Sequence, residues 1–374
     1  MRKSLFAGLA LTLGSISAPA LAAAPLLDCP MRDAAYSVDS PLVDLLLSAP
    51  AKAVIEKNLP GTLAKIPPFF AGTKSPTFAS ILTFKALSGM VAQGGVANLA
   101  KLDADLRKLP VTSSDKIARC ERYDDERPRF ALPTAKVRVL LFEKMTGFRD
   151  TPSVEAANAA FRAMAARKGW ALAVTDKGGA MHPSVLKNFD AVIWNNISGD
   201  VLTLSQRKAF RSYVEGGGGF VGIHGSAGDP VYFWDWYPDT LIGARFIGHP
   251  SEPQFQSAQI KIESSPSGIA TALSPGWTMK DEWYSFAKSA RLNGGKVIAT
   301  LDETTYTPGK NRFGGPPLAM GADHPIAWTR CVGKGKAFYS AIGHLPETYS
   351  NANYVTMLEQ SIAWAATGRN VVCK

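Results

Sequence analysis

The sequence predicts an α/β fold, with a doubly wound parallel sheet in its C-terminal two-thirds and a small helical segment before it. Two observations lead to this prediction. From about residue 136, short apolar runs rich in β-branched residues alternate with amphipathic stretches, as in parallel sheets with crossover helices. Before about residue 130, the apolar stripes have helical spacing and are separated by proline and glycine.

Each element follows from its own local pattern. The helical segment has four apolar stripes bounded by turn residues, at 42–47, 51–59, 77–91 and 98–109. The sheet begins with four apolar runs at 137–143, 170–176, 190–196 and 219–225, with helices between them at 153–169, 182–189 and 204–216. The pattern then loosens into an aromatic loop at 232–238 and shorter strands near 258–263, 281–286, 296–302, 324–330 and 336–344, before a last helix at 353–367.

The first 22 residues are typical of a secretory signal peptide. Arg2 and Lys3 form a positive start, and the apolar run that follows, 5–16, is too short for a stable membrane anchor. Ala20 and Ala22 then give the small-x-small pattern of a cleavage site. An uncleaved anchor helix is the alternative, and the proline and alanines after the run argue against it.

These patterns divide the chain into a signal peptide at 1–22, a helical segment at 23–133 and an α/β domain at 134–374. We expect a periplasmic or secreted protein with no stable membrane anchor after cleavage, because no later run reaches about 18 apolar residues. Lys and Arg (41) outnumber Asp and Glu (31), but they are scattered and form no basic block or zinc-finger spacing. A nucleic-acid partner is therefore not expected.

Four cysteines, an even number, suggest two disulfides in an exported protein. Three pairings are possible. We favour Cys29–Cys120, which would bracket the helical segment, and Cys331–Cys373, which would tie the C-terminus to a late strand. The chain has no CxxC motif, which argues against a redox or structural-zinc role.

Polar side chains follow several of the expected strands, where open α/β sheets bind ligands. The clearest case is His224, which stands between glycines at the turn after the run 219–225. Glycines at such a turn permit positive φ angles and close backbone approach. A nucleophile elbow would hold Cys or Ser at this bend. The histidine therefore argues against a thiol-dependent amidotransferase, although a tight turn with an exposed histidine remains an equally good interpretation.

The other candidates are histidines, acidic residues and aromatic residues near later turns. His249, His324 and His344 each adjoin a turn residue and, with the acidic pair Asp281 and Glu282, suggest a metal site or a general acid/base pair. Aromatic side chains near these groups are either platforms for sugar rings or a packed cover over the sheet. The further substrate-binding candidates are Arg149, Asn195, Asp229, Trp236, Trp283, Tyr284 and Trp328.

Five phrases occur in order along the chain: GGGFVGIHGSAGD, LIGARFIGHP, DEWYSF, HPIAWTR and GKGKAFYSAIGHLPETY. Together they resemble the ThuA-like (trehalose-utilisation) family over roughly residues 137–368. The resemblance implies a class I glutamine amidotransferase-like, mostly parallel flavodoxin-like fold and a link to sugar catabolism. It also implies polar family positions, which correspond here to His224, His249, Asp281, Glu282, Tyr284, His324, Trp328 and His344.

The chain departs from this family at the first strand, where the family phrase resembles GFRHDS. Here the chain reads Gly147-Phe148-Arg149-Asp150-Thr151, so the histidine is absent and Asp150 is its possible substitute. Either Asp150 takes the histidine's place or the activity differs.

Three hypotheses follow for the function. The first is an exported enzyme, of the hydrolase, lyase or isomerase class, that acts on a glycoside or an oxidised (keto) sugar. Its catalytic residues would be His224, Asp281, Glu282 and His344, and a divalent metal is an open option for its cofactor. The alternative is a non-catalytic sugar-binding module of the same fold. An amidotransferase-like hydrolase comes last, because it lacks a nucleophile.

Overall fold

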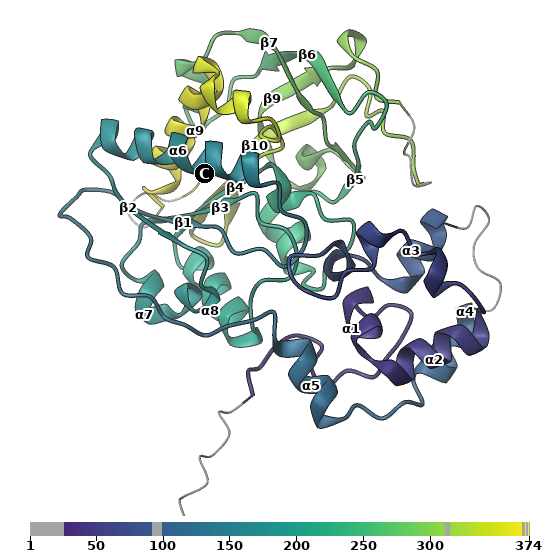
Figure 1. The fold of residues 1–374 in the computed structure, drawn as a ribbon. Coiled ribbons are helices and arrows are strands. Elements are labelled where there is room, and N and C mark those ends of the chain that lie inside the picture. Colours follow the sequence, from purple (N-terminus) through teal and green to yellow (C-terminus); the bar gives the residue numbers. More distant parts are fainter. Residues whose placement is uncertain are drawn as a thin grey trace, which may run out of the picture.

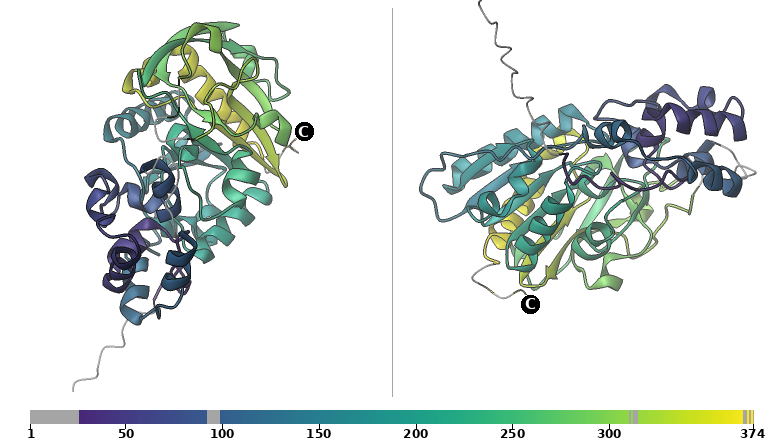
Figure 2. Two further views of the ribbon diagram at one scale, coloured as in Figure 1. Left: turned by 90° about the vertical axis from the view of Figure 1, so that its right-hand side faces the viewer. Right: turned by 90° about the horizontal axis from the view of Figure 1, so that it is seen from below.

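The computed structural model describes residues 26–91, 99–309, 311, 315–368, 371 and 373. The expected signal peptide lies outside these residues. Figure 1 shows a group of N-terminal helices beside a larger α/β part, and Figure 2 shows from two further sides that these helices gather at one side of it.

One sheet of nine strands dominates the described part of the chain, in the order β2-β1-β3-β4-β11-β10-β9-β6-β7. Its first five strands pair in parallel. These strands are β1 Arg138–Phe142, β2 Ala171–Thr175, β3 Ala191–Asn195, β4 Gly219–Ile223 and β11 Gly335–Ser340. Strands β3, β4 and β11 are buried along their whole length, which explains why β3 and β4 are nearly continuous apolar runs rather than alternating ones.

The rest of the sheet is antiparallel. It consists of β10 Pro325–Val332, β9 Lys296–Asp302, β6 Phe255–Ile262 and β7 Gly276–Glu282. The connection from β10 to β11 is only two residues long, and so short a link can join antiparallel strands but not parallel ones. A separate pair, β5 Phe246–Gly248 and β8 Ser285–Phe286, lies outside this sheet.

Helices cover both faces of the parallel part, so the predicted α/β fold with a doubly wound sheet is confirmed. Figure 1 shows α6 Thr151–Lys168 and α9 Ala352–Ala365 on one side of the strands, and α7 Pro183–Leu186 and α8 Leu204–Glu215 on the other. The sequence locates these helices well because their ends carry strong signals. For α6, Gly169 adopts the left-handed conformation just after the last turn.

The N-terminal segment is helical, as predicted, and has its own apolar core. Its helices are α1 Leu42–Leu47, α2 Ala49–Asn58, α3 Phe84–Val91, α4 Leu99–Leu106 and α5 Ser113–Cys120. The expected helix at 77–91 divides into a short 3₁₀ turn, Phe78–Ile81, and α3. Helix α5 was missed, although a capping box formed by Thr112 and Asp115 marks its start.

This helical segment contacts the carboxyl ends of the first parallel strands. The amide N–H of Thr77 donates to the carbonyl of Thr146 (3.0 Å), and the rings of Phe78 and Phe148 lie 4.9 Å apart. Lys144, just after β1, forms an ion pair with Asp124 (2.6 Å). The segment therefore lies at the edge of the sheet where ligands bind in folds of this class.

Both predicted disulfides are confirmed. Cys29 is bonded to Cys120 and Cys331 to Cys373, with Cα–Cα distances of 5.6 and 5.5 Å. The first closes the helical segment and the second ties the C-terminal end to β10. These bonds are compatible with export. Among the described residues, no helix is long and apolar enough to cross a membrane.

Candidate functional site

Three of the predicted residues meet at one point beyond the ends of the strands. His224 follows β4, Glu282 is the last residue of β7, and His344 follows β11. Four strands separate β4 from β7, which is about 24 Å across a flat sheet. The antiparallel part must therefore curl over the strand ends to bring Glu282 to the two histidines.

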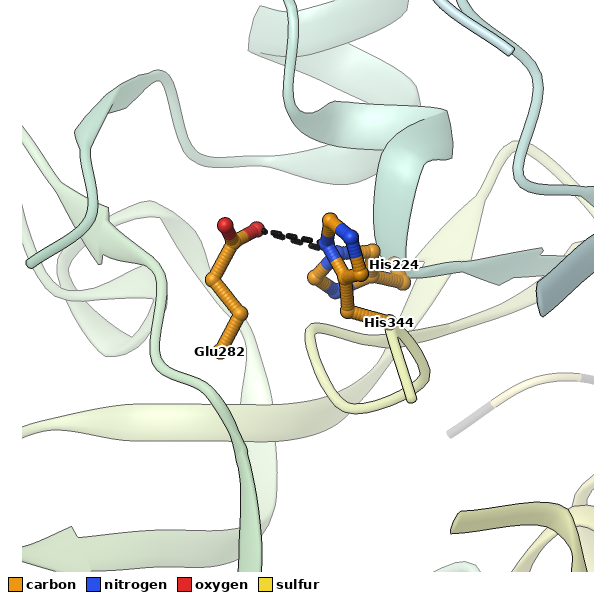
Figure 3. Close-up of side chains that lie close together, drawn as sticks. All are labelled: His224, Glu282 and His344. Carbon is orange, nitrogen blue, oxygen red and sulfur yellow. Dashed lines mark hydrogen bonds and ion pairs between the residues drawn. The ribbon is translucent and has the colours of Figure 1, made fainter. Parts of the chain in front are cut away.

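The three side chains form a nearly equilateral triangle of polar atoms. Oε2 of Glu282 lies 3.0 Å from Nδ1 of His344 and 3.3 Å from Nε2 of His224. The two imidazole nitrogens are 3.2 Å apart. Figure 3 shows the carboxylate pointing at both rings. The side chains of His224 and Glu282 are 4% and 2% exposed and that of His344 is 15% exposed, so solvent reaches the group on the His344 side.

The orientation of His224 is fixed by its backbone and by one hydrogen bond. Its own φ is +37°, so the histidine itself adopts the left-handed conformation at this turn. The neighbouring Gly225 does not. Nδ1 lies 2.7 Å from the carbonyl oxygen of Ala341. Because a carbonyl can only accept, Nδ1 carries the hydrogen, and the lone pair of the neutral ring is on Nε2, facing the triangle. Tyr284 stacks on this ring at 4.1 Å.

Glu282 is the common partner of the site. Its Oε1 accepts from Nε2 of Gln254 (2.5 Å) and lies 3.1 Å from Nδ1 of His249. Burial alone would raise the pKa of Glu282, but the close contacts with the imidazoles of His224 and His344 outweigh it and hold the pKa well below its usual range. The carboxylate therefore stays ionised at neutral pH although it is buried.

His344 lies between two carboxylates. Its Nδ1 faces Glu282 and its Nε2 lies 3.6 Å from Oδ2 of Asp150, the N-cap residue of α6. Burial lowers the pKa of His344, but the hydrogen bond and charge of Glu282, with the charge of Asp150, raise it above its ordinary value overall. Asp150 thus contacts the site from the position that follows Arg149, where the family phrase has histidine.

Asp281 supports the site without facing its centre. Burial raises the pKa of this fully buried side chain. Its two oxygens accept hydrogen bonds of 2.8 to 3.2 Å from the backbone N–H groups of Glu282, Gly343, His344 and Leu345 and from the hydroxyl of Thr348. Asp281 therefore holds the loop that carries His344. The structure places it as a positioning residue and not among the groups that a substrate would meet.

Three predicted contact residues are buried away from any ligand. Trp283 and Trp328 are 0% and 1% exposed, and their indole N–H groups donate to backbone carbonyls at 2.8 Å. His324 is 0% exposed and its nitrogens contact Glu303 and the carbonyl of Tyr284. The burial of Trp283 and Trp328 fits the packed-cover interpretation and not sugar platforms, and His324 does not face a solvent-accessible cleft as expected, because all three pack inside the antiparallel part.

The remaining candidates lie outside the triangle. Asn195 is buried and donates to Glu143 and to the carbonyl of Val154. Trp236 packs against Trp234 and under the guanidinium of Arg211 on α8, where the expected aromatic loop instead forms the helical turn Trp236–Ile242.

Two further candidates differ in exposure. Arg149 is exposed and contacts the carbonyl of Glu143. Asp229 is buried and accepts from the hydroxyl of Ser198 (2.6 Å) and the N–H of Gly199 (2.7 Å), and burial raises its pKa to about 7.

Of the predicted binding residues, the structure brings His249 and Tyr284 to the triangle. Sequence reasoning missed two neighbours. Gln254, which donates to Glu282, stands in a loop without a recognisable motif. Phe255 lies 5.0 Å from the ring of His344, and nothing in its strand pattern marks it as a site residue.

Fold and site together define a flavodoxin-like α/β protein with a buried histidine–glutamate cluster at its strand ends. The chain belongs to the ThuA family, described as trehalose utilisation, whose model matches residues 138–365. The resemblance expected from the sequence is thereby confirmed. A search of curated proteins finds none that matches this chain.

Among solved structures, the chain is similar to a ThuA-like protein from Bacteroides uniformis. The identity is 22%, the TM-score is 0.51, and the match covers 63% of this chain and 95% of that one. A ThuA-like protein from Parabacteroides merdae is similar at 14% identity with a TM-score of 0.44, covering 64% and 92% of the two chains. At these identities the first similarity supports the fold alone.

Proposed function

We propose that this protein is an exported carbohydrate-active enzyme that acts on a glycoside or an oxidised (keto) sugar derivative in sugar catabolism. One observation carries the proposal: the buried, ionised Glu282 contacts two histidines, and one of them, His344, is partly open to solvent. Membership of a family described as trehalose utilisation supports a saccharide as the substrate.

The chemistry of this site suits sugar oxygens. Hydrolysis of a glycosidic bond needs a proton on the leaving oxygen and a base that takes the proton of the attacking water. Isomerisation or elimination of a keto sugar needs a polarised carbonyl oxygen and a base that removes the proton from the adjacent carbon. The histidines would transfer protons, or hold a cation that polarises the oxygen, while Glu282 stabilises the positive charge between them. Tyr284 stacks on His224 and keeps that ring in place.

A non-catalytic sugar-binding module is the second candidate, and one observation favours it. The histidine of the family's first-strand phrase is absent, with Asp150 in its place. An amidotransferase-like hydrolase is less well supported. Both cysteine pairs are disulfide-bonded, and the hydroxyl of Ser226 donates to the carbonyl of Trp194.

The test is an assay by NMR of keto-disaccharides and the matching unoxidised disaccharides. We expect turnover by the wild type and at least a 100-fold loss of kcat/KM in His344→Ala and in Glu282→Gln. His182→Ala is the matched control, since that histidine caps α7, far from the site in sequence, and its ring contacts Ser184. Saccharide binding by calorimetry without any turnover would favour the binding module, and neither binding nor turnover would reject both.

Export is part of the proposal. Signal cleavage near Ala22 would release a chain in which both disulfides can form. Cell fractionation and N-terminal sequencing of the mature protein test this. An uncleaved protein in the cytosolic fraction would contradict it.

A further inference from the structure

In the triangle of polar atoms, the hydrogens of the three side chains are too few to place a donor between every pair of facing atoms. With the hydrogen of His224 on Nδ1, the bare Nε2 of the neutral ring faces the carboxylate oxygen of Glu282 at 3.3 Å. Two lone pairs then point at each other in a buried place. His344 can donate one N–H to Glu282, but this leaves the Nε2 of His224 without a donor of its own unless that ring takes up an extra proton.

A single cation at the centre removes this repulsion. The three edges are 3.0, 3.2 and 3.3 Å, almost equal. An ion about 2.1 Å from each ligand atom sets neighbouring ligands about 3.0 to 3.4 Å apart in octahedral or tetrahedral geometry. The triangle therefore has the size of one face of a coordination shell. All three ligand atoms lie within 4.8 Å of one another.

The outer nitrogens of both rings are held as metal-binding histidines usually are. Nδ1 of His224 donates to the carbonyl of Ala341, and Nε2 of His344 faces the carboxylate of Asp150. Such outer partners fix which nitrogen carries the hydrogen and leave the inner nitrogen bare for a metal. On the other side of Glu282, Gln254 donates to the oxygen that does not face the rings.

We propose that Nε2 of His224, Oε2 of Glu282 and Nδ1 of His344 bind a divalent first-row transition metal such as Zn²⁺. Two imidazoles and one carboxylate favour such an ion over Mg²⁺ or Ca²⁺, which prefer oxygen ligands. Three protein ligands would leave at least one position open for a substrate oxygen, and the partly exposed His344 is the side of the group that solvent reaches. The proposal deepens the proposed function by naming the group that would polarise the sugar.

The test measures metal rather than activity. Untagged protein, purified without a metal-affinity step, is analysed by mass spectrometry for metal content. After chelator treatment it is titrated with ZnCl₂ by calorimetry. We expect one Zn²⁺ per chain, affinity at least 100-fold weaker in Glu282→Gln and His344→Ala, and 10- to 100-fold weaker in Asp150→Asn, which removes only an outer partner. His182→Ala should bind as the wild type does.

Two results would overturn the proposal. One is a stripped wild type that binds no Zn²⁺, Ni²⁺ or Mn²⁺ at 100 μM. The other is stoichiometric binding that survives in the Glu282→Gln, His344→Ala double variant, which would place the ion elsewhere. Circular dichroism confirms that each variant is folded. Turnover by metal-free protein would support the proposed enzyme and reject a role for the metal in it. Bound metal without turnover of any saccharide would support the metal site and reject the proposed enzyme.

Discussion

Asp150 and Glu282 approach the same imidazole from opposite sides, because His344 has its Nε2 3.6 Å from the first carboxylate and its Nδ1 3.0 Å from the second. Asp150 precedes α6 and Glu282 ends β7, so helix, strand and the loop after β11 meet at one ring. The ring is held in a single orientation with an acceptor at each nitrogen.

The pKa of His344 should depend on both neighbouring carboxylates, and more strongly on the nearer one, Glu282. In metal-free protein we expect the pKa of His344 to lie above its ordinary value, to fall in Asp150→Asn and to fall further in Glu282→Gln, because both charges favour the protonated ring. NMR titration of the ring protons measures this. Asp39→Asn, at an exposed site, is the control and should change nothing. An unchanged pKa of His344 in Glu282→Gln would contradict the arrangement.

Replacing Asp281 should loosen the loop that carries His344. In Asp281→Asn an NH₂ group takes the place of one acceptor oxygen and faces N–H donors that then lose their partner. We expect the free energy of unfolding to drop by about 2–4 kcal/mol. Thr348→Val removes one of the same hydrogen bonds and should cost only about 1 kcal/mol. Urea unfolding compares them, and equal losses would show that Asp281 does not organise the loop.

Asp229 should make stability depend on pH. Burial raises its pKa to about 7 in the folded chain, against an ordinary value of 3.8. Between these values the folded state binds more protons than the unfolded state, so this residue's contribution to stability falls as pH rises, by up to about 1.4 kcal/mol per pH unit. Asp229→Asn removes this slope, and its Oδ1 can still accept from Gly199. The stability difference between variant and wild type should therefore grow from about pH 4 to 7. Parallel profiles would show that the carboxyl is not buried as described.

The disulfides should differ in their effect on stability. Cys29 and Cys120 are 91 positions apart, and Cys331 and Cys373 are 42 apart. Since a longer closed loop restricts the unfolded chain more, loss of the first should cost about 4.6 kcal/mol and loss of the second about 3.9 kcal/mol. Thermal unfolding of the two double Cys→Ser variants checks this. A larger cost for the C-terminal bond would show that native packing, and not loop closure, dominates.

Much of the fold was predictable because its signals are local. The runs that form β1, β3 and β4 are almost entirely apolar, as is typical of strands buried on both faces. Capping residues and glycines at the helix ends also indicate where helices begin and end. The antiparallel pairing of β6, β7 and β9 was not predictable in the same way, because short strands with loose patterns do not say which neighbour they join.

The sequence by itself determined that His224 stands at the turn after a buried strand, that no cysteine is near it in the chain, and that Glu282 and His344 belong to later expected strands. Local composition settles these points, because each depends on a few neighbouring residues. Only the tertiary structure decided which candidates meet. The curl of the antiparallel part brings Glu282 to His224 across four strands and buries Trp283, Trp328 and His324 as it does so. Contacts between distant strands depend on how the whole sheet curls and pairs, which no local pattern records.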